Sequence, residues 1–274
     1  MRPIALLLSA CLLAAAARAD ETALTRLDTA DDSQGWDAVG RLDIGDRGFC
    51  TGALIAPRLV LTAAHCLFDR GTGQRVDVAS ITFMAGWRNG RAAAYRTARR
   101  AVPHPGYVFG DGAGDVDRVG RDIALIELDQ PIRLPSIQPF AVASQPAAGD
   151  EVGIVSYAMD REGAPSLQKV CHVLDGRSDV LILSCSVDFG SSGAPVFAIR
   201  DGVARVVSVI SAKAEVDGRN VALGTALDGP LPALRAALEA DGIDPADVRA
   251  PSVRVRSGGA GTGAKFVKAP PPQP

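Results

Sequence analysis

Residues 62–66 of the chain read Thr-Ala-Ala-His-Cys and come after the apolar stretch Gly52–Ile55. Two more distinctive stretches follow: Arg121–Leu128, which reads RDIALIEL, and Gly190–Val196, which reads GSSGAPV. Each one alone has an ordinary structural explanation, such as a turn beside a cysteine or a loop that ends at a strand. In chain order, however, the three stretches supply a histidine, an aspartate and a serine, and this combination points to chemistry.

The chemistry is that of an activated hydroxyl. A serine is a weak nucleophile until a base takes its proton, and a histidine base works better when a buried carboxylate fixes its tautomer. Gly190, two residues before Ser192, places no side chain beside the serine. Backbone N–H groups there are therefore free to face a developing oxyanion. The order serine, acid, histidine of the α/β-hydrolases is not the order found here.

These stretches closely resemble the trypsin/chymotrypsin-like serine peptidase family. TAAHC matches the family motif letter for letter, Arg121–Leu128 is similar to its DIALL segment, and Gly190–Pro195 matches the GxSGxP form of secreted bacterial, glutamyl-endopeptidase-like members. Val102–Tyr107 resembles the loop before the aspartate, which gives His104 a structural role. The resemblance spans about residues 36 to 240. It implies an all-β chain of two antiparallel six-stranded β-barrels, with the active site between them and a C-terminal helix.

By position, the resemblance makes His65 the general base, Asp122 its orienting carboxylate and Ser192 the nucleophile. The N–H groups of Gly190 and Ser192 would form the oxyanion hole. Such an exported serine endopeptidase forms an acyl-enzyme intermediate and needs no cofactor. The alternative is a catalytically silent, peptidase-like binding or regulatory protein. Such relatives usually have one of the three residues replaced, and none is replaced here.

The residue before the nucleophile departs from many animal members of the family. Those members carry an aspartate that a freshly cut N-terminus pairs with, whereas this chain has Ser191. We therefore expect activity without a new N-terminus, with the oxyanion loop held by local hydrogen bonds and a nearby disulfide.

The substrate pocket is predicted by the same positional comparison. It would be formed by Ser186, Val187, Ile210, Ser211, Ala212 and Lys213. Ser186 stands where trypsin-like enzymes have an aspartate, and Ile210 stands where glutamate-selective relatives have a histidine. Burying a cation without a partner is costly. A small to medium apolar substrate side chain is therefore predicted, with Lys213 and Asp188 at the rim in contact with solvent.

Export, which the N-terminal segment predicts, would place the cysteines in an oxidising compartment, where disulfides form. Without Cys11, which lies in the N-terminal apolar segment, four remain: Cys50, Cys66, Cys171 and Cys185. An even number allows three pairings. A zinc site is the competing interpretation, since His65 and His172 each adjoin a cysteine, but no CxxC pair is present. The resemblance implies Cys50–Cys66 and Cys171–Cys185.

Short strands separated by Gly, Pro and Asp clusters dominate the middle of the chain. The strands are expected over Ala38–Leu42, Gly52–Ile55, Leu59–Thr62, Ser80–Phe83, Ile123–Leu128, Glu151–Tyr157, Val180–Leu183, Pro195–Ile199, Ala204–Ser211 and Val221–Gly224. Leu231–Ala240 has leucines on one helical face, and Gly229 and Pro230 precede it.

The two ends have compositions of their own. Residues 1–19 read as a secretory signal peptide with cleavage after Ala19, although Leu8–Cys11 also resembles a lipoprotein box and an uncleaved buried helix is a third interpretation. Residues 245–274 read as a disordered, basic Pro/Gly-rich tail; Gly258–Lys265 superficially resembles a phosphate-binding loop but lacks the Ser/Thr after its lysine. Between them we predict an N-terminal segment (20–35), a first barrel (36–135) and a second barrel with the helix (136–244).

Composition limits the partners. The chain has 274 residues, a net charge of −2 and 47% apolar residues. A nucleic-acid-binding domain would usually be basic. The N-terminal apolar run is too short to span a bilayer comfortably, and nothing similar recurs later in the chain. The expectation is therefore a secreted or periplasmic monomer that acts on polypeptide substrates, with no nucleic-acid partner, no transmembrane segment, no metal and no organic cofactor.

Overall fold

The computed structural model describes residues 21–110, 116–216 and 218–241. The predicted signal peptide, the predicted tail and its phosphate-loop-like stretch therefore lie outside the described residues. In the described part, no helix is long and apolar enough to cross a membrane.

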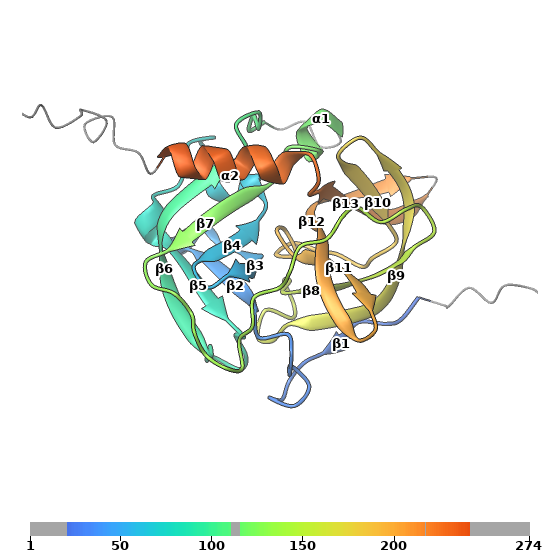
Figure 1. The fold of residues 1–274 in the computed structure, drawn as a ribbon, viewed down its shortest axis with the longest axis horizontal. Coiled ribbons are helices and arrows are strands. Elements are labelled where there is room, and N and C mark those ends of the chain that lie inside the picture. The colour runs from blue at the N-terminus through green and yellow to red at the C-terminus, as the bar shows by residue number, and fades with distance from the viewer. Residues whose placement is uncertain (1–20, 111–115, 217, 242–274) are drawn as a thin grey trace, which may run out of the picture. The chain divides into compact units, whose positions relative to one another are not determined.

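The first half of the chain forms a closed six-stranded antiparallel barrel, in the order β2-β3-β4-β7-β6-β5 (Figure 1). Its strands are β2 (Val39–Ile44), β3 (Phe49–Ala56), β4 (Leu59–Thr62), β5 (Ile81–Ala85), β6 (Ala94–Pro103) and β7 (Ala124–Leu128). The sheet closes because β2 pairs with β3 on one side and with β5 on the other.

The second half forms a second barrel. Its strands are β8 (Glu151–Ser156), β9 (Ser166–Arg177), β10 (Val180–Leu183), β11 (Pro195–Arg200), β12 (Val203–Val216) and β13 (Arg219–Ala226). These six strands follow the order β9-β10-β13-β12-β11-β8, and the pairing of β8 with β9 closes the ring. A short strand, β1 (Thr25–Arg26), adds to β9 from outside the ring. The prediction of two six-stranded antiparallel barrels is confirmed.

The C-terminal helix α2 (Pro230–Asp241) follows the second barrel in sequence but packs against β6 and β7 of the first (Figure 1). Leu231, Leu234 and Leu238 are buried in this contact, as their shared helical face predicts. Arg100 on β6 donates a 2.8 Å hydrogen bond to the Leu238 carbonyl, near the end of the helix where carbonyls lack helical partners. The helix thus ties the end of the second half to the first barrel.

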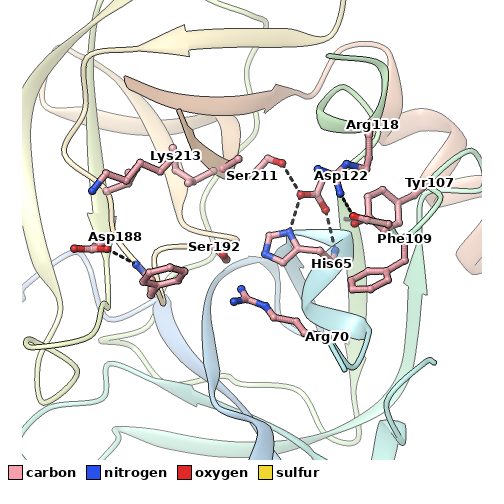
Figure 2. Close-up of a pocket in the computed structure, with 15 residues that line it drawn as sticks. His65, Arg70, Tyr107, Phe109, Arg118, Asp122, Asp188, Ser192, Ser211 and Lys213 are labelled. Atoms are coloured by element: carbon pink, nitrogen blue, oxygen red, sulfur yellow. Dashed lines mark hydrogen bonds and ion pairs between the residues drawn. The ribbon is translucent and has the colours of Figure 1, made fainter. Parts of the chain in front are cut away.

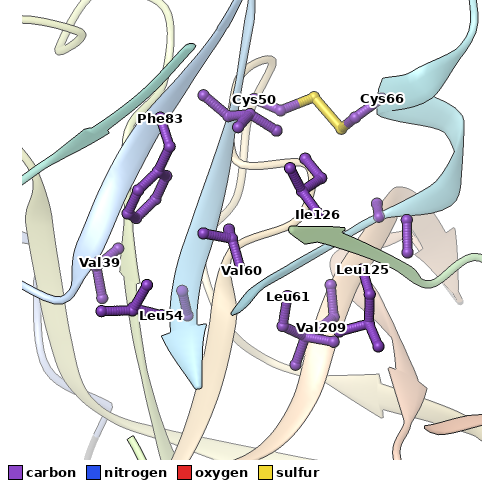
Figure 3. Packing of buried hydrophobic residues seen from close by; sticks show 14 of the residues in the cluster. Val39, Cys50, Leu54, Val60, Leu61, Cys66, Phe83, Leu125, Ile126 and Val209 are labelled. Atoms are coloured by element: carbon purple, nitrogen blue, oxygen red, sulfur yellow. A yellow bond between two sulfur atoms is a disulfide. The ribbon is translucent and has the colours of Figure 1, made fainter. Parts of the chain in front are cut away.

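Buried apolar side chains join the barrels. One cluster fills the first barrel, contains the leucines of α2 and extends to Val209 on β12, which lies near Leu61 and Leu125 (Figure 3). A second cluster, which includes Val152, Leu181 and Val196, fills the second barrel. Since the first cluster contains side chains from both halves, the barrels share a packed interface.

Three strands were absent from the sequence prediction: β1, β6 and β9. The ten-residue β6 contains Arg96, Arg99 and Arg100, so its pattern looks polar although it alternates between buried and exposed positions. Strand β9 carries charged residues among its apolar ones in the same way. The short helices are α1 (Val116–Val119) and the 3-10 turns η1 (Gly45–Arg47), η2 (Ala64–Leu67) and η3 (Val78–Ser80).

Candidate active site

His65 lies just after strand β4. That strand ends at Thr62, whose hydroxyl donates a 2.9 Å hydrogen bond to the carbonyl of Thr51 on β3, and the chain then turns into η2. The Cys50–Cys66 disulfide links η2 to β3 next to the histidine. The side chain of His65 is only 15% exposed. Strand, turn and disulfide therefore fix the histidine at the edge of the first barrel.

Asp122 lies between α1 and β7 and is bonded to His65 twice. Its Oδ1 accepts the backbone N–H of His65 at 2.8 Å, and its Oδ2 lies 2.7 Å from His65 Nδ1. Burial alone would raise the pKa of the Asp122 carboxyl. The charge of His65 and the hydrogen bonds from His65 and Ser211 outweigh burial and hold that pKa below its ordinary value. The aspartate is therefore charged and fixes the orientation of the imidazole.

The second barrel also holds Asp122. The hydroxyl of Ser211 on β12 donates a 2.5 Å hydrogen bond to Oδ2 of the aspartate. Thr225 on β13 donates to the backbone carbonyls of Val119 and Asp122 at 2.5 and 3.3 Å. The aspartate from the first barrel is thus positioned by two strands of the second.

Ser192 lies on the loop before β11 and lines the same cleft as His65 and Asp122. Its carbonyl accepts the N–H of Thr51 at 2.8 Å. Gly193 adopts φ +79°, and a Cβ on it would lie 2.1 Å from the Thr62 hydroxyl. Only glycine fits such a close approach at this φ. In Figure 2, Ser192 lies between His65 on one side and Asp188 on the other.

The backbone around Gly190 is held by two contacts. The Gly190 carbonyl accepts the Thr51 hydroxyl at 2.9 Å, and the Phe189 carbonyl accepts the Met159 N–H at 2.8 Å. The carbonyl and N–H of a trans peptide point in opposite directions, so the Gly190 N–H points away from Met159. Among the described residues, the N–H groups of Gly190 and Ser192 donate no hydrogen bond to another protein group. Both remain available to an external acceptor.

The cleft around these residues has a volume of about 580 Å³. Five of the six predicted pocket residues line it: Val187, Ile210, Ser211, Ala212 and Lys213. The sixth, Ser186, lines an adjoining pocket of about 170 Å³ that shares Val187 and Lys213 with the cleft. Asp188 also lines the cleft, and its carboxylate accepts the backbone N–H of Phe189 at 2.9 Å.

Further residues of the cleft were absent from the sequence prediction: Arg70, Phe109, Arg118 and Phe189. Phe189 is 63% exposed and directly precedes Gly190, so its position in the sequence was the one available signal. Arg70 and Phe109 come from loops of the first half and Arg118 from the short helix α1, and only the fold brings them to the cleft. A second hollow of about 490 Å³ continues past His65 and Gly190 and is lined by Phe49, Phe68 and Met159.

The four cysteines form both disulfides that the family resemblance implies. Cys50 pairs with Cys66, and Cys171 on β9 pairs with Cys185 just after β10. The sulfurs of Cys50 and Cys66 lie close to the His65 ring, as a zinc site would require. Because both sulfurs are bonded to each other, neither is a thiolate that could bind zinc.

His104 accepts the Gly106 N–H at 3.1 Å within its loop.

The model of the Trypsin family matches residues 28–224. The chain belongs to this family. The chain is 31% identical over 166 residues to human Serine protease 23, covering 54% of this chain and 42% of that protein. It is 27% identical over 154 residues to the Glutamyl endopeptidase of Bacillus licheniformis, covering 55% and 45%. The chain thus spans less than half the length of these two relatives.

A solved structure supports the fold independently. A Glu endopeptidase in complex with MPD matches with a TM-score of 0.64 at 17% identity, over 78% of this chain and 95% of that one. This member of the trypsin-like serine protease family therefore has the chymotrypsin-like fold, with glutamyl-endopeptidase-like relatives, as its motifs indicated.

Proposed function

We propose that the chain is an exported serine endopeptidase in which Ser192 is the nucleophile, His65 the general base and Asp122 the orienting carboxylate. One observation carries the proposal: Asp122 is bonded to both the backbone N–H and the ring of His65, and that ring shares a cleft with Ser192. This is the arrangement that activates a hydroxyl for acyl transfer.

The reaction proceeds in two halves. Ser192 Oγ attacks the substrate carbonyl while His65 Nε2 takes the hydroxyl proton, and Asp122 stabilises the imidazolium that forms. The N–H groups of Gly190 and Ser192 bind the oxyanion. His65 then returns the proton to the leaving amine, which leaves an acyl ester on Ser192. A water, deprotonated by His65, attacks the ester, and the acid product leaves as Ser192 regains its proton.

No hydrogen bond joins Ser192 Oγ to the His65 ring in the described part of the chain. Catalytic hydrogen bonds in enzymes without substrate are often long and tighten when substrate binds. The position of Ser192 beside His65 in Figure 2 is compatible with that behaviour.

The substrate is a polypeptide, and its side chain before the cut is small to medium and apolar. Val187 and Ile210 line the cleft, and Ile210 is 2% exposed. Ser186, in the adjoining pocket, offers a hydroxyl instead of a carboxylate, so a substrate Arg or Lys finds no buried carboxylate there. The two disulfides support export, because such bonds persist in oxidising compartments.

Turnover of peptides tests the proposal. The purified protein should cleave the peptides of a mixed library at internal peptide bonds. The Ser192→Ala substitution should lower kcat by roughly 10⁴-fold or more. Ser80→Ala is the matched control: it alters a partly exposed serine on η3 that does not line the cleft and whose hydroxyl bonds the Asp77 carbonyl, so it should leave kcat unchanged. A folded wild type that binds peptides and cleaves none would favour the alternative function, a peptidase-like binding protein.

A further inference from the structure

Arg161 lies in the loop between β8 and β9, against the segment that carries Ser192. Its Nη1 donates to the Ser156 carbonyl at 2.9 Å, and its Nη2 donates to the Ser156 hydroxyl at 3.1 Å. The same Nη2 lies 3.4 Å from the hydroxyl of Ser191, the residue directly before Ser192. One guanidinium thus connects the end of β8 to the residue before the nucleophile.

The surroundings of this guanidinium are unusual for an arginine. Ser156 and Ser191 are fully buried, Arg161 itself is half-buried, and all its hydrogen-bond acceptors are neutral oxygens. Burial lowers the pKa of Arg161, and the charge of Asp188 acts in the opposite direction. A cation withdrawn from water and bonded to neutral groups costs free energy. Because this placement of Arg161 costs free energy, we interpret it as serving the site and not the stability of the fold.

Ser191 transmits this contact to the oxyanion loop, which we define as residues 188–192. Its hydroxyl accepts the Asp188 N–H at 3.3 Å, and its own N–H donates to the Asp188 carbonyl at 2.9 Å. The Arg161 loop also holds the Phe189 carbonyl through Met159. The Gly190 and Ser192 amides therefore lie on the oxyanion loop, and the loop that carries Arg161 contacts both the Ser191 side chain and the Phe189 backbone of that segment.

We propose that Arg161 is a positioning residue that holds the oxyanion loop with its two amides toward the cleft. It supplies from within the chain the cation that a new N-terminus would otherwise bring to the residue before the nucleophile. This inference rests on the proposed function, because it assigns a role in the same reaction. The presence of Ser191 in place of an aspartate agrees with this role. The Arg161 guanidinium already donates to Ser156, so a neutral hydroxyl at position 191 suffices as its further acceptor.

Kinetics of three variants test this role. Arg161→Ala should lower kcat about 10- to 100-fold with little change in KM, because oxyanion binding occurs only in the transition state. Arg161→Lys should recover part of the loss, since an ammonium reaches some of the same oxygens. Arg177→Ala is the matched control: the Arg177 side chain is 78% exposed on β9, and its loss should leave kcat unchanged.

Two readouts separate positioning from a general loss of structure. Methylguanidine, added at millimolar concentration, should restore activity to Arg161→Ala by filling the vacated site, and should not affect wild type. A peptide boronic acid, whose tetrahedral adduct bears an oxyanion, should bind Arg161→Ala about 10- to 100-fold more weakly. The matched peptide amide, which forms no adduct, should bind both proteins equally.

The outcomes are distinguishable. If wild type cleaves no peptide and binds no boronic acid, the proposed function fails. If wild type is active and Arg161→Ala retains full kcat and full boronic acid affinity, the function stands and the role of Arg161 is wrong. Equal losses in boronic acid and amide binding, without rescue by methylguanidine, would likewise overturn it, because they would indicate a structural role only.

Discussion

Ser211 and Asp122 are 89 residues apart in the sequence, and the hydroxyl of one donates a 2.5 Å hydrogen bond to the carboxylate of the other. The bond crosses from strand β12 of the second barrel to the aspartate of the first. It ends on Oδ2, the same oxygen that contacts His65 Nδ1. Assembly of the candidate site is therefore coupled to the docking of the two barrels.

Substitution Ser211→Ala should lower both stability and activity. A hydrogen bond to a charged group contributes about 1.5–3 kcal/mol. Without it the Asp122 carboxylate keeps, among the described residues, only its hydrogen bonds to His65. We expect a loss of about 2 kcal/mol in urea unfolding and about tenfold in kcat/KM. Ser208→Ala removes a buried 2.8 Å hydrogen bond on the same strand that does not reach Asp122. It should lower stability but leave kcat/KM near wild type; equal activity losses in both variants would contradict this account.

The carboxylate of Asp122 should make folding sensitive to acid. Its pKa is lower in the folded chain than in the unfolded chain. The charged form therefore stabilises the fold above the unfolded value, about pH 4, and that contribution is lost as pH falls through the folded pKa. Asp122→Asn should consequently show a shallower fall of Tm below about pH 4 than wild type. Parallel Tm curves for the two proteins would refute the prediction.

Gly193 should tolerate no side chain. Its φ is +79°, and a Cβ would lie 2.3 Å from the Thr51 carbonyl as well as against Thr62. Gly193→Ala should therefore destabilise the chain by several kcal/mol, on the order of 3 or more, measured by thermal or urea unfolding. Gly202 has a similar φ of +75° with nothing within 4 Å of a new Cβ. Gly202→Ala should cost only about 1 kcal/mol, and an equal cost for both would show that close packing is irrelevant.

Cleavage specificity should follow the apolar walls of the cleft. Profiling of a mixed peptide library should give small to medium apolar residues before the cut. Ile210→His places an imidazole in the wall and should raise cleavage after Glu relative to wild type, because a protonated ring offers a buried carboxylate a partner. A dominant preference of the wild type for Arg, Lys or Glu would contradict the prediction, since the cleft would then bind a charge that Ser186 and Ile210 cannot match.

Local motifs made the fold and the three central residues predictable. TAAHC, the aspartate before an apolar strand and GSSGAP each require particular residue types within a few positions, so a single sequence displays them. The contacts of Ser211 and Thr225 with the Asp122 segment join residues about a hundred positions apart. No pattern of composition or spacing reveals such pairs, because they arise only when two barrels dock.

The same reason explains the residues that were missed. Arg161 looks like an ordinary loop arginine until the fold places it 3.4 Å from Ser191. Strand β6 was missed because its arginines obscure the alternation of buried positions. The leucine pattern predicted helix α2. It did not predict that the helix packs on the first barrel, because an apolar helical face does not identify the surface that it packs against.

Covalent labelling tests the central claim most directly. A fluorophosphonate probe reacts with a serine only when a base has activated it and an oxyanion hole is formed. Intact mass spectrometry followed by peptide mapping should find one adduct, on Ser192, in the folded wild type, and none in Ser192→Ala. Labelling of His65→Ala should be slower by several orders of magnitude, roughly 10⁴-fold. A folded wild type that acquires no adduct, or a Ser192→Ala variant that is labelled as fast as wild type, would contradict the account.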